Sequence, residues 1–292
     1  MKLLTYIEAG VEKVGVLSQD ESCVFSIEEI GLKYQDMNEL IEKMTPEEKQ
    51  DLESYAMKNQ GVPREKIQLE APIPNPKQDI ICLGINYMAH AIESAKYKKE
   101  AFGGERPYAV YFSKRVNRSV ADNGIIPRYE ALVDSLDYEV ELAVVIGKDA
   151  KNVTEAEAFD YVFGYTMIND VSARNVQTRH KQWYFGKSLD GFLPMGPYLV
   201  TEDEFNRPPV LHISSKVNGE LRQNASTDLL IFGISHVIAE LSQGMTLKAG
   251  TIIAMGTPAG VGMGMDPPRF LQSGDEVICN IENIGTLTNY VR

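Results

Sequence analysis

An apolar run that carries two acids near its start dominates the pattern of hydrophobic and polar positions. Residues 137–147 read DYEVELAVVIG: Glu139 and Glu141 alternate with apolar residues, and the run then stays apolar until Gly147. Its β-branched residues and the closing glycine predict a buried strand. Side chains on a strand alternate between its two faces, so Glu139 and Glu141 are expected to point the same way.

A third acid, Asp170, follows a second strand-like run, residues 164–170, which read GYTMIND. Together with Glu139 and Glu141 it would give a formal charge of about −3 and a set of oxygen ligands, which suits Mg²⁺ or Mn²⁺. The competing interpretation is a solvated strand face, because charged residues are usually exposed. The apolar run after Glu141 argues for burial and strengthens the metal-site interpretation.

A histidine and a glutamate, His90 and Glu93, lie three positions apart after a strand predicted at residues 79–84. If this segment is helical, the two side chains are neighbours. A carboxylate that orients an imidazole is the usual arrangement of a general base. A surface pair is the alternative, since exposed pairs are common and weak. The charged residues 96–106, with two adjacent glycines, predict a mobile loop that could act as a lid.

Two basic residues follow the acids. At helical spacing, Asp170, Arg174 and Gln177 share one face. Arg174 could neutralise Asp170 in a plain salt bridge, or it could bind a substrate carboxylate through two hydrogen bonds. Lys187 lies in a predicted turn, where a lone lysine is usually solvated.

A glycine-rich stretch, residues 252–264, reads IIAMGTPAGVGMG. A phosphate-binding loop must open a helix, but Asp266 and two prolines follow instead. The sequence therefore predicts a loop whose backbone N–H groups bind a carboxylate. The three other histidines, His180, His212 and His236, are expected to be structural.

Proline and turn signals divide the chain. The alternating prolines of residues 71–76 stiffen that stretch towards polyproline II. We therefore expect a small α+β domain over residues 1–70 and a second domain over residues 71–292. Further predicted elements are a hairpin over 2–18, a helical region over 37–59 in which Thr45 and Pro46 mark a helix start, a short capped helix over 154–159, a hairpin turn at 217–220 and a helix over 229–242.

Composition narrows the possible partners. The net charge of −12 argues against nucleic acid, which needs a basic surface. Three widely spaced cysteines without a Cys-x-x-Cys motif indicate reduced thiols and a cytoplasmic protein. The acid at Glu8 argues against a signal peptide, and no apolar run is long enough to span a bilayer.

Five motifs, taken together and in this order, resemble the fumarylacetoacetate hydrolase family across residues 80–292. They are GINY-x-x-H-x-x-E (84–93), DYEVELAVVIG (137–147), NDVSAR (169–174), GKS-x-D (186–190) and GTPAGVG (256–262). The resemblance implies a mostly β fold with some α, a mixed β roll, with residues 1–70 as a small α+β extension. It also implies a homodimer.

The family resemblance also implies roles for individual residues. Glu139, Glu141 and Asp170 match its metal ligands, which hold Mg²⁺ or Mn²⁺. His90 and Glu93 match its water-activating dyad, carried on a segment that closes over the ligand.

Four further positions match residues at the family's substrate. Lys187 matches a catalytic position beside the developing enolate, and Arg174, Gln177 and Thr257 match positions that bind the oxo-acid end. Lys114 departs from the family pattern, because it is followed by arginine where many relatives have proline. We therefore do not assign it a catalytic role.

These roles imply an enzyme that acts on a small 2-oxo acid. The intact dyad favours a metal-dependent hydrolase that cleaves a C–C bond in an acylpyruvate or fumarylpyruvate-like 2,4-dioxo acid through an enolate. The same motifs leave open an oxaloacetate decarboxylase and a 2-hydroxyhepta-2,4-diene-1,7-dioate isomerase. A non-catalytic binder of metal and dicarboxylate is a further alternative.

Overall fold

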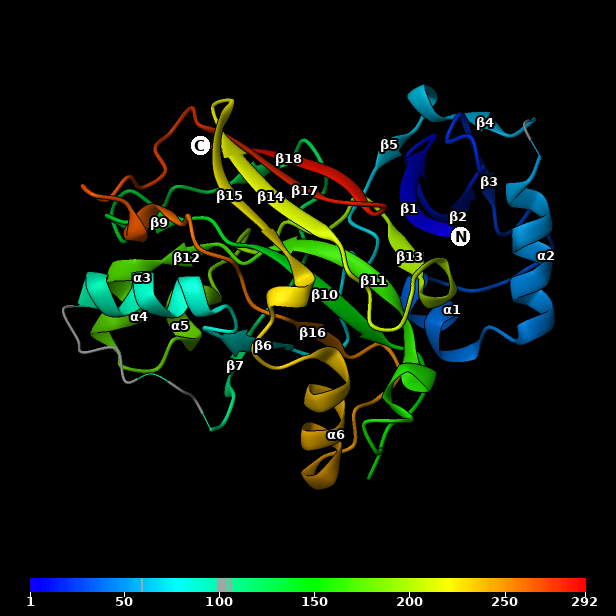
Figure 1. Cartoon of the computed structure of the whole chain (residues 1–292). Coiled ribbons are helices and arrows are strands. Elements are labelled where there is room, and N and C mark those ends of the chain that lie inside the picture. Colours follow the sequence, from blue (N-terminus) through cyan, green and yellow to red (C-terminus); the bar gives the residue numbers. More distant parts are fainter. Residues whose placement is uncertain (59, 99–103, 105–106) are drawn as a thin grey trace.

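The computed structural model describes residues 1–58, 60–98, 104 and 107–292. Its main feature is an 11-stranded mixed sheet (Figure 1). In spatial order the strands are β4 (Val62–Pro63), β3 (Cys23–Ser26), β2 (Val11–Leu17), β1 (Lys2–Glu8), β13 (Leu199–Thr201), β11 (Val162–Asn169), β10 (Val140–Ile146), β16 (Ile252–Ala254), β6 (Ile80–Gly84) and β7 (Val110–Lys114), with β5 (Gln68–Leu69) beside β1.

A five-stranded sheet and a two-stranded ribbon complete the β structure. The smaller sheet has the order β15 (Glu220–Ser226), β14 (His212–Val217), β17 (Glu276–Ile281), β18 (Gly285–Val291) and β8 (Ile125–Ile126), and the ribbon pairs β9 (Leu136–Asp137) with β12 (Ser172–Ala173). The mostly β fold predicted from the sequence is confirmed.

The described helices are short. The α-helices are α1 (Met37–Lys43), α2 (Pro46–Ala56), α3 (Met88–Lys98), α4 (Arg174–Arg179), α5 (Tyr184–Lys187) and α6 (Ile234–Gly244), and the 3₁₀ turns are η1 (Arg64–Lys66), η2 (Ala158–Tyr161), η3 (Glu202–Glu204), η4 (Thr227–Leu229) and η5 (Gly262–Gly264). Within the part of the chain that the structure describes, no helix is both long and apolar enough to cross a bilayer.

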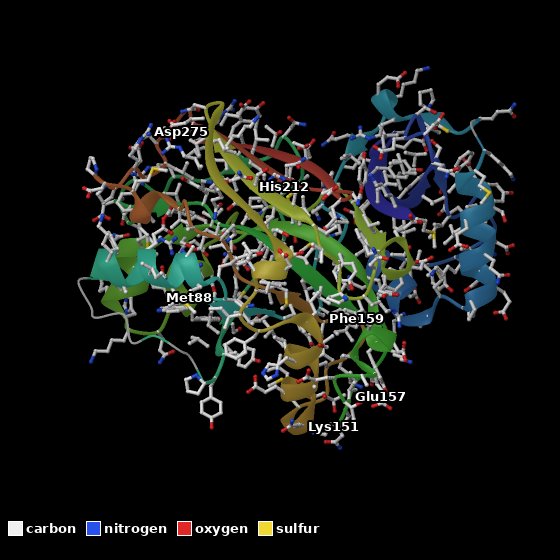
Figure 2. All side chains as sticks on the ribbon, viewed as in Figure 1. Met88, Lys151, Glu157, Phe159, His212 and Asp275 are labelled. Atoms are coloured by element: carbon white, nitrogen blue, oxygen red, sulfur yellow. The ribbon has the colours of Figure 1, made fainter. Side chains whose placement is uncertain are left out.

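Two apolar cores flank β10, which is buried along its whole length. Val140, Leu142 and Val144 pack into the core that also includes residues of the smaller sheet. Ala143 and Val145 point to the opposite core, which includes residues of α1 and α2. Figure 2 shows side chains filling the space on both sides of the large sheet. Because both faces are covered, the strand reads as a continuous apolar run, as parallel strands do in other folds.

The first 70 residues share the large sheet with the rest of the chain. The predicted hairpin over residues 2–18 is β1 and β2. β1 also pairs with β13, with Leu3 opposite Leu199. The predicted domain boundary after residue 70 stays a prediction. Hydrogen bonds of the large sheet join residues before this boundary to residues after it.

The helical region predicted over residues 37–59 is two helices. Thr45 caps the second of them in a capping box with Glu48, as its sequence indicates. The backbone of Met44, the residue before the cap, is not helical and separates α1 from α2.

Two predicted helices begin elsewhere or do not form. The helix expected from residue 229 begins at Ile234, because the Thr227 hydroxyl bonds to Pro209 O and Leu211 N and cannot cap it. At residues 154–159, the Thr154 hydroxyl donates to the Glu157 carboxylate instead of capping the backbone, and the segment forms turns before η2.

Several smaller expectations can be compared with the structure. Cys23, Cys82 and Cys279 are free and buried. His236 stacks on Phe232, and exposed His212 lies on β14, away from α3 (Figure 2). Most of the segment predicted to be a lid, residues 99–103 and 105–106, lies outside the described residues.

Candidate active site

Strands β10 and β11 bring the three predicted acids together. Glu139 immediately precedes β10, Glu141 lies within it, and Asp170 follows β11 directly. The strands are antiparallel with Val140 opposite Asn169, so Asp170 lies beside Glu139 and its N–H donates to Glu139 O at 2.8 Å. All three acids are buried, and one oxygen from each lies within 4.8 Å of the others.

Three buried cations pair with two of these acids. Lys187 Nζ lies 2.6 Å from both Glu139 Oε2 and Asp170 Oδ2. Arg174 Nη2 lies 2.6 Å from Glu139 Oε1, and Lys114 Nζ lies 2.7 Å from Asp170 Oδ1. Lys187 is therefore buried, contrary to what its position in a turn suggested. Arg174 does not form the salt bridge to Asp170 that its helical spacing allowed.

Glu141 has no ion-pair partner among the described residues. Its Oε2 accepts a hydrogen bond from Gly256 N at 2.8 Å. Burial, reinforced by the negative charges of Asp170 and Glu139, raises the pKa of Glu141 well above its ordinary value. At Glu139 burial is again the largest single influence and raises the pKa, but the positive charges of Lys187 and Arg174 and the hydrogen bond from Lys187 together outweigh it, and the pKa is lowered.

The charges around the acids leave room for a cation. The acids are Asp137, Glu139, Glu141 and Asp170, and the basic residues are Lys114, Arg174 and Lys187. When all are ionised, the acids exceed the basic residues by one negative charge. An all-oxygen donor set of three close carboxylates is the type that a hard divalent cation prefers. The residues present therefore fit a divalent metal held by Glu139, Glu141 and Asp170.

The predicted histidine–glutamate pair forms on α3. His90 Nδ1 lies 3.0 Å from Glu93 Oε2, and His90 is buried. The other carboxylate oxygen of Glu93 accepts a hydrogen bond from Gly260 N at 3.0 Å. Glu93 is thus held on both sides, and it orients the imidazole so that Nε2 is the nitrogen left for a ligand.

The glycine-rich loop donates backbone N–H groups to carboxylates, as its sequence predicts, and the carboxylates belong to the protein itself. Besides Gly256 and Gly260, the N–H groups of Gly262 and Met263 donate to Asp137 at 2.7 and 3.0 Å. Asp137 also accepts from Arg174 Nε at 2.9 Å. It therefore ties this loop to Arg174.

Thr257 and Gln177 are held in place by neighbours. The Thr257 hydroxyl donates to Val140 O at 2.9 Å and accepts from Gln223 Nε2 at 2.6 Å. Gln177 Oε1 accepts from Arg174 Nη1 at 3.1 Å. Both side chains are preorganised before any ligand binds.

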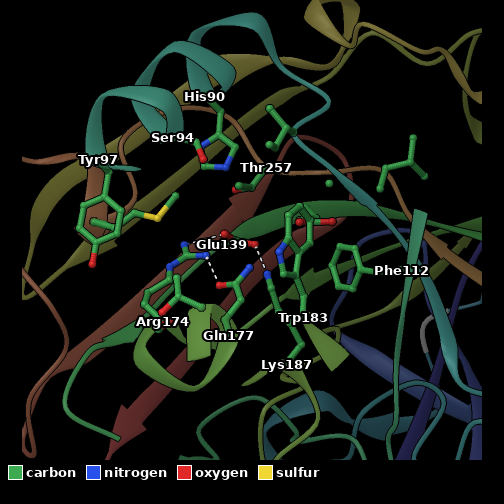
Figure 3. A pocket seen from close by; sticks show the side chains of 16 residues that line it. His90, Ser94, Tyr97, Phe112, Glu139, Arg174, Gln177, Trp183, Lys187 and Thr257 are labelled. Atoms are coloured by element: carbon green, nitrogen blue, oxygen red, sulfur yellow. Dashed lines mark hydrogen bonds and ion pairs between the residues drawn. The ribbon is translucent and has the colours of Figure 1, made fainter. Parts of the chain in front are cut away.

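A cavity of about 40 Å³ unites these groups (Figure 3). This volume exceeds the roughly 10–15 Å³ that one water requires. The lining residues are Leu83, Gly84, Ile85, His90, Ser94, Tyr97, Phe112, Glu139, Glu141, Arg174, Gln177, Thr178, Trp183, Lys187, Thr257 and Met263. Of the nine predicted site residues, only Glu93 and Asp170 are not in the lining; each is bonded to a group that is.

Sequence reasoning missed four residues of this site. Asp137 had a usable signal, because it precedes Glu139 by two positions and alternation places both on one side. Lys114 stands at the end of a predicted strand, and only the packing of β7 against β6 directs it to Asp170. Gln223 and Ser94 carried no signal in the sequence.

The sequence matches a known protein family and a named relative. Residues 79–292 match the family model described as fumarylacetoacetate (FAA) hydrolase C-terminal. The chain is 48% identical over 226 residues to oxaloacetate tautomerase YisK of Bacillus subtilis (strain 168), an alignment that covers 77% of this chain and 73% of that protein.

Solved structures agree over the full length. A fumarylacetoacetate hydrolase from Exiguobacterium antarcticum superposes with a TM-score of 0.83 at 36% identity, covering 100% of this chain and 99% of that chain. A maleylpyruvate hydrolase from Sphingobium, in complex with manganese(II) and pyruvate, gives 0.78 at 28% identity, covering 100% and 98%. With a family model that spans most of the sequence, the chain belongs to the fumarylacetoacetate hydrolase family.

Proposed function

We propose that the protein is a metal-dependent tautomerase that interconverts the keto and enol forms of a short 2-oxo dicarboxylic acid of the oxaloacetate type. One structural observation carries the proposal: a small cavity brings the His90–Glu93 pair to the buried carboxylates. The relative at 48% identity is named for oxaloacetate tautomerisation, and this supports the isomerase class over the hydrolase.

Glu139, Glu141 and Asp170 would hold the metal, for which Mg²⁺ and Mn²⁺ are the candidates. When bound, such an ion polarises the 2-oxo group and stabilises negative charge on its oxygen. Arg174 and Gln177 would donate hydrogen bonds to the oxo-acid end of the substrate, and Thr257, whose one hydroxyl proton goes to Val140 O, would line the cavity beside that end. These three side chains are already fixed by hydrogen bonds, so little conformational freedom is lost on binding.

The proton transfers fall to this chain's own residues. His90, oriented by Glu93, takes a proton from carbon 3, and the electron pair of that C–H bond forms the C2–C3 double bond while the carbonyl electrons move to the oxygen. Lys187 has one N–H bond left beyond those it donates to Glu139 and Asp170, and this bond can supply the proton to the oxygen. The reverse sequence restores the keto form, and no water is consumed.

Hydrolysis of an acylpyruvate is the second candidate, favoured by the same dyad. It requires His90 to activate water, and the dyad's position beside the cavity would serve that step equally well. The solved maleylpyruvate hydrolase is similar to this chain over its full length. Decarboxylation of oxaloacetate uses the same oxo-acid contacts without a base.

A product-resolved assay separates the three reactions. Oxaloacetate is supplied as the enol or the keto form with Mg²⁺, and its ultraviolet absorbance, pyruvate and CO₂ are followed, with an acylpyruvate run in parallel. We expect fast equilibration of the tautomers, lost after chelation with EDTA. His90→Ala should slow it by ~10²–10⁴-fold while Mg²⁺ binding stays unchanged. Pyruvate released from the acylpyruvate, with no effect on the tautomers, would show that hydrolysis is the activity.

A further inference from the structure

One buried polar side chain in the cavity wall has no part in the proposed reaction. Ser94 lies four residues after His90 on α3, and both side chains line the cavity (Figure 3). Its side chain is only 3% exposed. No hydrogen bond joins its hydroxyl to another described residue, and its oxygen is not among the fully enclosed polar atoms that lack a partner. The hydroxyl is therefore open to the cavity, where a ligand group or a water can pair with it.

The position of Ser94 relative to His90 limits what that ligand group can be. Residues four apart on a helix have their Cβ atoms about 5–6 Å apart. In the proposed reaction, His90 takes the proton from carbon 3 of the substrate. In a four-carbon 2-oxo dicarboxylic acid, the distal carboxylate is bonded directly to that carbon. A carboxylate one bond away from the reacting carbon is within reach of the next turn of α3.

The facing helix offers a second neutral donor. Gln177 on α4 is 9% exposed and lines the same cavity. Its Oε1 is occupied by Arg174 Nη1, so its amide N–H bonds remain for a ligand. Leu83, Ile85 and Phe112 form an apolar part of the wall, which cannot pair with a carboxylate. Because Gln177 is assigned with Arg174 to the oxo-acid end, that end is expected against α4, which leaves Ser94 on α3 for the distal carboxylate.

We infer that Ser94 is a specificity-determining residue that donates a hydrogen bond to the distal carboxylate of a short 2-oxo dicarboxylic acid. It selects such acids over 2-oxo monocarboxylic acids that lack the distal carboxylate. The inference rests on the proposed function, because it takes carbon 3 to lie beside His90.

The test measures binding with two stable acids that differ only in the distal carboxylate. Malate and lactate are titrated calorimetrically into the full-length protein with saturating Mg²⁺. The proteins are wild type, Ser94→Ala and Ser54→Ala, a matched serine-to-alanine change in the remote helix α2, where the hydroxyl bonds to Gln50 O. We expect wild type to prefer malate, and Ser94→Ala to bind malate about 10-fold or more weakly, the usual effect of losing a hydrogen bond to a charged group. Lactate affinity should stay unchanged in all three.

Each outcome bears on one proposal only. The role of Ser94 is overturned if wild type binds the two acids with equal affinity or does not bind malate. It is also overturned if Ser94→Ala weakens the binding of both acids equally. Loss of malate preference in Ser94→Ala supports it. Tautomerisation of oxaloacetate is assayed on the same wild-type sample. If wild type prefers malate but does not equilibrate the tautomers, the proposed function is refuted and the binding role of Ser94 stands.

Discussion

Glu141 differs from the other buried acids in what compensates its charge. Glu139 and Asp170 each face ammonium or guanidinium groups, whereas Glu141 has one backbone N–H. Its pKa is raised by burial and by the two neighbouring acids. A metal-free protein must therefore either protonate Glu141 or keep a buried negative charge without a partner, and the second choice destabilises the fold.

This predicts a pH-dependent effect of Glu141→Gln. A carboxyl whose pKa is higher in the folded than in the unfolded protein contributes stability at pH below the unfolded value, and this contribution is lost as pH rises through the folded value. In EDTA, the variant should therefore gain stability relative to wild type between pH 5 and pH 8. Urea unfolding at both pH values measures it. The variant should also lose the stabilisation that Mg²⁺ gives wild type.

A difference in unfolding free energy between Glu141→Gln and wild type that is the same at pH 5 and pH 8 would contradict this account of Glu141. Lys43→Gln serves as a control, since it removes one exposed charge far from the cavity.

Asp137 joins the glycine-rich loop to Arg174. Each carboxylate oxygen accepts two N–H bonds: Oδ1 from Gly262 and Tyr138, and Oδ2 from Met263 and Arg174. Asp137→Asn would turn one oxygen into an NH₂ group that faces two donors. We expect a loss of about 3 kcal/mol in unfolding free energy, typical of breaking a buried ion pair, together with reduced activity.

The matched control is Asp122→Asn, where the carboxylate accepts from Thr288 N at 2.8 Å but lies outside the lining of the cavity. It should lower stability and leave the activity per folded molecule unchanged. An Asp137→Asn protein with wild-type stability in urea would mean that these four hydrogen bonds contribute little.

Among secondary-structure elements, α3 and η5 form the contact that fixes the dyad. A Cβ built on Gly264 would lie 1.8 Å from Glu93 Oε1, so no side chain fits there while Glu93 keeps its place. Gly260 N holds the same oxygen. Since Gly264 does not have a positive φ, it is required for space and not for backbone conformation.

Gly264→Ala should therefore displace Glu93 and release His90. The turnover number is expected to fall by ~10²-fold or more, within the range for a lost general base, whereas Mg²⁺ binding persists. Gly233→Ala is the control, because Gly233 also has a negative φ and its added Cβ would meet nothing within 4 Å. Unchanged turnover in Gly264→Ala would mean that the backbone of the loop shifts to accommodate the Cβ and that the position of Glu93 on α3 does not depend on this contact.

The large sheet joins the two parts of the chain, residues 1–70 and residues 71–292. β1 continues the sheet from β13, and Leu3, Val16 and Leu40 share a core with Val145 and residues of β6 and β16. Hydrogen bonds and apolar contacts thus join the residues before the proline stretch at 71–76 to the residues after it. Unfolding of one side would expose the core of the other.

We therefore predict a single cooperative unfolding transition for the whole chain, with equal calorimetric and van't Hoff enthalpies. A protein limited to residues 71–292 should have a lower midpoint and aggregate, because the edge of β13 and its apolar neighbours become exposed. Two separate transitions in the full chain, or an unchanged midpoint for residues 71–292, would show that residues 1–70 fold as an independent domain.

The sequence by itself determined those features that depend on neighbours along the chain. Alternation placed Glu139 and Glu141 on one side of β10, three-residue spacing paired His90 with Glu93, and the glycine-rich stretch provided backbone donors. These follow from the repeats of strand and helix, which are local and hold in any fold.

Only the tertiary structure decided the rest. Lys187 and Lys114 are distant in sequence and each occupies a position where lysine is usually solvated, yet both are buried against Asp170. Arg174 bonds Glu139 and Asp137 and not Asp170, because α4 begins only at Arg174, so Asp170 lies outside the helix, and the β9–β12 ribbon brings Asp137 alongside α4. Such pairings depend on which strands meet, and the free energy of burying a charge is set by partners that the local pattern does not contain.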